Sequence, residues 1–185
     1  MRGRAFIMWI LAVLCIAVES TILHKIAIYG ILPNLSLCMV VSCSLLFGSA
    51  FGRRLGLWIG FLQDVLFLNV LGFFTLLYFL VGQLAGLFKN GFDQNNLLLS
   101  LTITALFDFV FSCICYLFFH FFQGRIDVLF YLNSTILPEL VYTMAASIPV
   151  YFLIRFLGVR LERLFEKHRH QAAEGSMPFE LRSEK

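Results

Sequence analysis

Two aspartates stand alone inside long apolar stretches, and their chemistry sets the first question about this sequence. Asp64 lies near the middle of the apolar run 55–71, and Asp108 lies near the middle of a second run. A carboxylate at that depth in a bilayer costs roughly a few kcal/mol or more, so such residues normally face protein or water. Gly56 and Gly60 precede Asp64 at intervals of four, which places all three on one helical face. We therefore expect an inward-facing surface of small residues and one acid.

Two uses of the buried acids are open at this stage. One is a proton or ion relay, as in an ion-coupled carrier. The other is a polar cluster that fixes helix packing or receives a helix of a partner protein. We favour the second, because no Lys, Arg or His lies at the expected depth of Asp64 and Asp108 to complete a relay. Glu19 and Glu139 lie near helix ends, where interfacial snorkelling or packing explains the first and the helix dipole explains the second.

The sequence carries none of the motifs that would indicate catalysis or metal binding. No G-x-S-x-G, H-E-x-x-H or Walker-type pattern is present. The five cysteines lie in apolar runs, form no C-x-x-C pair and have no histidine at metal-ligand spacing. They are best interpreted as small buried side chains. We expect no enzymatic activity, no metal site and no cofactor.

The composition predicts an all-α polytopic membrane protein. The 185 residues are 60% hydrophobic and only 14% charged, whereas soluble domains average about 25% charged residues. Six membrane-spanning helices are expected, at residues 5–23, 35–51, 55–71, 73–88, 97–119 and 136–157. They make up a transmembrane domain at 1–157, followed by an amphipathic cytoplasmic extension at 158–171 and a disordered tail at 172–185.

The basic residues predict the orientation of these helices. With the N-terminus inside, all 14 Lys and Arg residues except Lys25 and Arg125 fall on the cytoplasmic side. Arg53 and Arg54 are expected to form the loop between the second and third helices. This topology places both ends of the chain in the cytoplasm. The modest net charge of +3 gives no indication of nucleic-acid binding.

Three pairs of glycines at i, i+4 spacing fall at the expected inner ends of the second, third and fourth helices. Such pairs let helix backbones approach closely. We expect these helices to pack tightly in the cytoplasmic half and to splay apart toward the outside. The pairs are Gly48 and Gly52, Gly56 and Gly60, and Gly82 and Gly86.

With these residues in view, the chain resembles the MreD family of bacterial rod shape-determining membrane proteins over roughly residues 5–157. Pro33 and Asn34 before a leucine-rich helix resemble a Pro-Asp-Leu segment of the family, although Asn34 replaces the usual acid. Other matching positions are Ser20-Thr21, the group Gly56, Gly60, Phe61 and Asp64, the turn Leu71-Gly72, and Val81-Gly82 with Gly86.

The resemblance implies a non-enzymatic scaffold of the cell-elongation and peptidoglycan-synthesis machinery in the bacterial inner membrane. It implies an MreC-like single-span partner, with RodA, the elongation transpeptidase and MreB as further partners, and contact with membrane lipid. The candidate packing or partner-binding residues are Pro33, Asn34, Gly56, Gly60, Asp64, Gly82, Gly86 and Asp108.

A second interpretation is kept open. The family is similar in fold to the substrate-binding subunits of energy-coupling-factor vitamin transporters. Those subunits typically dock through an A-x-x-x-A pattern in the first helix, whereas Ala5, Ala12 and Ala17 are not four apart here.

Overall fold

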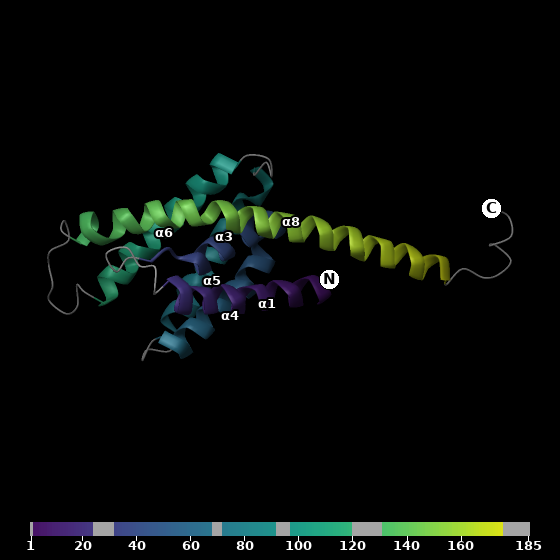
Figure 1. Ribbon diagram of the computed structural model, residues 1–185, viewed down its shortest axis with the longest axis horizontal. Helices are drawn as coiled ribbons and strands as arrows, with labels where there is room; N and C mark the ends of the chain where they lie inside the picture. Colours follow the sequence, from purple (N-terminus) through teal and green to yellow (C-terminus); the bar gives the residue numbers. More distant parts are fainter. Residues whose placement is uncertain (1, 24–31, 68–71, 92–96, 120–130, 176–185) are drawn as a thin grey trace. The chain divides into compact units, whose positions relative to one another are not determined.

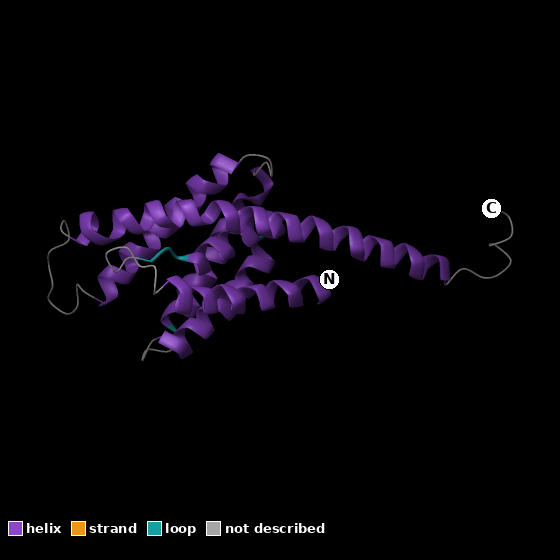
Figure 2. Cartoon of the chain, in the orientation of Figure 1, coloured by secondary structure: helices purple, strands orange, loops and turns teal. Residues whose placement is uncertain are grey.

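The computed structural model describes residues 2–23, 32–67, 72–91, 97–119 and 131–175, and within these ranges every regular element is a helix (Figures 1 and 2). The α-helices are α1 (Arg2–Val18), α3 (Leu35–Phe47), α4 (Ser49–Phe67), α5 (Phe73–Ala85), α6 (Leu97–Phe119) and α8 (Leu137–Gly175). Shorter turns extend three of them: η1 (Glu19–Leu23) after α1, η2 (Gly86–Gly91) after α5, and η4 (Leu132–Ile136) before α8. The all-α prediction is therefore confirmed for the part of the chain that is described.

Two described segments are long and apolar enough to cross a membrane, Leu97–Phe119 and Leu132–Gly158. Shorter apolar helices cover Ile7–Thr21, Leu35–Phe47 and Phe73–Lys89. Six membrane crossings and two cytoplasmic ends stay predictions.

The chain divides into two compact units, Met1–Ile154 and Arg155–Lys185. The boundary falls inside α8, which contains Pro149 and continues without a break through the predicted extension at 158–171 to Gly175. Within the second unit, the Arg160 guanidinium lies 4.4 Å from the centre of the Phe156 ring. Of the predicted tail, residues 176–185 lie outside the described part of the chain.

Helix α3 forms the core of the first unit. Every residue from Ser36 to Leu46 is buried, and α3 contacts α1, α4, α5 and α6. Its many small side chains allow this, because small residues let neighbouring helices come close. The helix starts at an N-cap, where the Asn34 side-chain oxygen accepts a hydrogen bond from the Leu37 backbone N–H at 2.9 Å.

The break between α3 and α4 lies at Gly48, and the predicted loop at Arg53 and Arg54 is wrong. Gly48 has a φ of +95°, a conformation that glycine adopts without the penalty a side chain would incur. Both arginines lie inside α4, where arginine is a good helix former. Gly52 therefore belongs to α4, and the pair it forms with Gly48 does not share one helix.

Helices α4 and α5 pack against each other along a seam of glycines. A Cβ atom added at Gly60 would lie 2.5 Å from the Phe74 carbonyl oxygen, and one added at Gly56 would overlap the Tyr78 carbonyl group. Nearer the start of α4, Gly52 meets Gly82, and Ser49 meets Gly86. Residues three or four apart on α4 thus meet residues four apart along α5 and the first residue of η2, in the reverse order. The two helices form an antiparallel hairpin whose backbones touch over several turns.

Candidate functional site

Asp64 lies in the last turn of α4 and caps the beginning of α5. Its side chain is fully buried. One carboxylate oxygen accepts hydrogen bonds from the Gly72 and Thr75 backbone N–H groups, at 3.0 and 2.9 Å, and from the Thr75 hydroxyl. The other oxygen accepts one from the Phe74 N–H at 2.9 Å. The first amides of a helix lack partners within the helix and carry partial positive charge, so a carboxylate is stabilising there.

The capping role explains why this position needs an acid. Helix α5 begins after Gly72, which has no side chain with which to cap it. Asp64 supplies the missing acceptors from the preceding helix, next to the contact that Gly60 makes with Phe74 and Thr75. The acid is sheltered by the start of the next helix of the same chain.

Asp108 is equally buried but has no comparable partners. Its exposed fraction is 0%, and neither carboxylate oxygen has a hydrogen-bond partner among the described residues. The Thr143 hydroxyl of α8 is a polar neighbour of this acid, without the geometry of a hydrogen bond. Thr143 itself accepts a hydrogen bond from the Asn34 backbone N–H at 3.2 Å. The polar neighbour of Asp108 therefore lies on α8, whereas the hydrogen-bond partners of Asp64 lie at the start of α5.

A polar cavity of about 250 Å³ lies among the first unit's helices, at the end of α1 and the beginning of α3, α5 and α8. Two carboxylates that are far apart in the sequence, Glu19 and Glu139, line it. The remaining described lining residues are all uncharged: Leu32, Asn34, Gln63, Phe74, Tyr78, Phe111, Ser112, Cys115 and Tyr131. The charge on the cavity wall is therefore acidic, with no basic residue among the described lining.

Short hydrogen-bond chains hold the cavity wall in place. The Ser36 hydroxyl donates to Glu19 and accepts from the Gln63 amide at 3.0 Å, which ties α3 to α1 and α4. On the other wall, the Ser112 hydroxyl donates to Glu139 at 3.2 Å. Among the described residues, each cavity carboxylate thus accepts a hydrogen bond from one serine hydroxyl, and no cation lines the cavity.

Asn34 joins three helices at the edge of the cavity. Its side-chain oxygen accepts from the Leu37 N–H and also from the Tyr78 hydroxyl at 3.0 Å, and its own N–H donates to Thr143. The preceding Pro33 has a carbonyl that accepts from Leu35 N at 3.1 Å. One carboxylate oxygen of an aspartate at position 34 could accept the same two hydrogen bonds. The amide oxygen of Asn34 therefore replaces the acid in these contacts.

The structure separates the predicted site residues into two groups. The first group belongs to the packing of α4 against α5: Asp64 caps α5, and close backbone contacts are made by Gly56, Gly60, Gly82 and Gly86. The second group lies at or near the cavity. Asn34 lines it, and Asp108 lies one helical turn from the cavity residue Ser112.

Glu19 and Glu139 were not expected to share a site, yet both line the cavity. The available signal was that the predicted topology places both near the outer ends of their helices.

The described residues thus define an all-helical protein with apolar membrane-type helices and an acidic cavity, and no cluster of three or more potential metal ligands occurs among them. Residues 2–160 match the family model described as rod shape-determining protein MreD, so the chain belongs to the MreD family. Membership implies a membrane protein with a role in determining rod shape. Comparison with curated proteins and with solved structures gives no match.

Proposed function

We propose that the protein is a non-enzymatic scaffold of the cell-elongation complex and binds an MreC-like single-span partner at the acidic cavity. The observation that carries this proposal is the contrast in packing inside the first unit. The glycine seam of α4 and α5 is closed by backbone contacts, which leaves no room there for a visiting helix. The cavity instead leaves Glu19 and Glu139 without a cation among its described lining.

The chemistry of the cavity favours a basic group on the partner. A carboxylate in a low-dielectric site is stabilised by a nearby opposite charge, and intramembrane acids typically pair with one another, with basic residues or with backbone groups. Under the predicted topology, the cavity faces the outer half of the membrane. A partner helix with a Lys or Arg near its outer end would therefore complete the site. RodA, the elongation transpeptidase and MreB stay predicted members of the same complex.

Co-purification with an MreC-like protein tests this proposal. Glu139→Gln and Glu19→Gln keep the size of the side chain and remove its charge, so we expect folded protein that retains much less partner. Glu162→Gln removes the same charge from a residue of the second unit and is the matched control, with partner retention expected at the wild-type level. Unchanged partner retention by both cavity variants would rule out the cavity as the docking site.

The proposal includes a multi-pass location in the bacterial inner membrane, with the chain ends in the cytoplasm. Single-cysteine labelling from the outside in a cysteine-free background tests this orientation. Cysteines at positions 25 and 125 should react with a membrane-impermeant reagent in intact cells freed of the outer membrane, and a cysteine at position 89 should not. Labelling at position 89 would contradict the topology.

The alternative, a vitamin-binding subunit of an energy-coupling-factor transporter, predicts a ligand retained through purification or thermal stabilisation by a vitamin. No comparison with curated proteins or solved structures supports it. If the protein is a scaffold, neither a retained ligand nor stabilisation by a vitamin is expected.

A further inference from the structure

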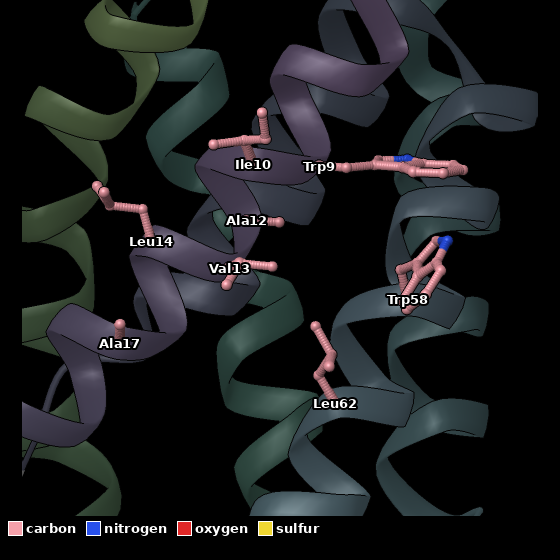
Figure 3. Close-up of a pocket in the computed structure, with 8 residues that line it drawn as sticks. All are labelled: Trp9, Ile10, Ala12, Val13, Leu14, Ala17, Trp58 and Leu62. Carbon is pink, nitrogen blue, oxygen red and sulfur yellow. The ribbon is translucent and has the colours of Figure 1, made fainter.

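A pair of tryptophans divides an apolar groove on the surface formed by α1, α4 and α5. The rings of Trp9 and Trp58 lie 5.5 Å apart, centre to centre, and both are exposed. Figure 3 shows Trp9 extending from α1 toward α4, where its ring lies near that of Trp58. One lobe of about 510 Å³ lies between α1 and α4 and includes Val13 and Leu62. A second lobe of about 460 Å³ runs along α4 toward Thr75 of α5.

A single cation lines the described part of the second lobe. Arg54 is exposed one turn before Trp58, and its Nε donates to the Ala50 carbonyl at 2.9 Å, which fixes its position beside the helix. Tryptophans gather at membrane interfaces, and basic residues gather on the cytoplasmic side. Under the predicted topology, Arg54, Trp9 and Trp58 therefore lie near the inner headgroup region, and both lobes extend from there into the hydrocarbon.

We propose that this groove binds an anionic phospholipid of the cytoplasmic leaflet. The phosphate contacts the Arg54 guanidinium, a planar donor whose geometry suits phosphate oxygens. The indole N–H groups of Trp9 and Trp58 offer further donors at the same level, and one acyl chain lies in each lobe. A transmembrane helix, about 10 Å across, fits less well, because the tryptophan pair interrupts the groove that such a helix would need to occupy.

Arg53 provides an internal control for the role of Arg54. It is the adjacent residue with the same charge, but its guanidinium donates to the Gln83 side chain at 3.0 Å, across the α4–α5 hairpin. Arg53 does not line either lobe. A lipid held by local contacts at the groove therefore depends on Arg54 and not on Arg53, whereas a lipid attracted by general positive charge depends on both arginines equally.

Native mass spectrometry of the full-length protein with phosphatidylglycerol or phosphatidylcholine of identical acyl chains tests the proposal. The wild type should retain the anionic lipid about fivefold better, the ratio expected for one basic residue at a membrane surface. Arg54→Gln should abolish this preference, and Arg53→Gln should keep it. Equal retention of both lipids by the wild type, or equal losses in the two variants, would overturn the proposal.

A photo-crosslinking amino acid in place of Trp58 identifies the occupant in native membranes. Adducts to phospholipid are expected. Adducts formed mainly to another protein, or to a second copy of this chain, would show that a helix occupies the groove and would overturn the lipid assignment. This result is independent of partner binding at the acidic cavity, so the two proposals fail separately.

Discussion

The α4–α5 hairpin and the acidic cavity use buried carboxylates in opposite ways. In the hairpin, Asp64 accepts four hydrogen bonds from three residues at the start of α5. In the cavity, Glu19 and Glu139 each accept from one hydroxyl, and the neighbouring Asp108 has no hydrogen-bond partner among the described residues. A carboxylate with a full set of donors stabilises the fold, whereas one with few donors is available to another molecule.

The difference shows that the depth of an acid in an apolar run does not determine its role. Asp64 and Asp108 look alike in sequence, and both are fully buried. Only the supply of backbone donors distinguishes them, and this supply depends on which helix begins nearby. Substitutions in the hairpin and in the cavity should therefore have different effects.

The largest expected effect comes from closing the glycine seam with a side chain. Gly56→Leu places carbon atoms where the Tyr78 carbonyl lies, and a backbone group cannot move aside as a side chain does. We expect a loss of about 3 kcal/mol or more in the free energy of unfolding, seen as lost monodisperse protein on size exclusion. Gly91→Leu is the control, because nothing lies within 4 Å of a Cβ there. Similar behaviour of the two variants would contradict the seam.

Removal of the α5 cap should have the next largest effect. Asp64→Leu leaves buried N–H groups of Gly72, Phe74 and Thr75 without acceptors, at an expected loss of about 3 kcal/mol. Asp64→Asn should fall between this variant and the wild type, because its amide supplies one acceptor oxygen instead of two. Denaturant titration in mixed micelles measures both values. Wild-type stability of Asp64→Leu would disprove the capping role.

Substitution of Asn34 should have a smaller and more selective effect on the free energy of unfolding. Asn34→Ala removes the acceptor of Leu37 and Tyr78, at an expected loss of about 1–2 kcal/mol. Asn34→Asp retains an oxygen in the same place and should stay near wild type in thermal unfolding. An equal loss in both variants would indicate that the amide nitrogen, and not its oxygen, is the important group.

The smallest effect is expected at Asp108. Asp108→Asn breaks no hydrogen bond among the described residues, so the free energy of unfolding should change by less than about 1 kcal/mol. The same titration that is used for Asp64→Asn provides the direct comparison. A loss at Asp108 as large as the loss at Asp64 would show that the two acids do not differ in the way proposed.

Local patterns in the sequence predicted part of this arrangement. The spacing of Gly56, Gly60 and Asp64 predicted one face, and the structure packs both glycines and the acid against α5. The position of the turn before α4 was predicted wrongly. The charges of Arg53 and Arg54 suggested a loop at these residues, whereas the chain turns at Gly48, where glycine adopts a positive φ.

The cavity was missed for a different reason. Its residues come from six segments far apart in the chain, and periodicity within one helix carries no information about which helices meet. Helix α3 was equally hard to place at the centre, because it is apolar or small on every side and so has no polar face to indicate its orientation.

The most direct test of the account compares partner retention by Asp64→Asn and Glu139→Gln, each expressed per folded molecule. The account predicts that Asp64→Asn yields less folded protein, but that the folded fraction retains the MreC-like partner normally. It predicts that Glu139→Gln folds as well as the wild type and loses the partner. Full partner retention by folded Glu139→Gln, together with loss of the partner from folded Asp64→Asn, would contradict the division between structural and recognition acids.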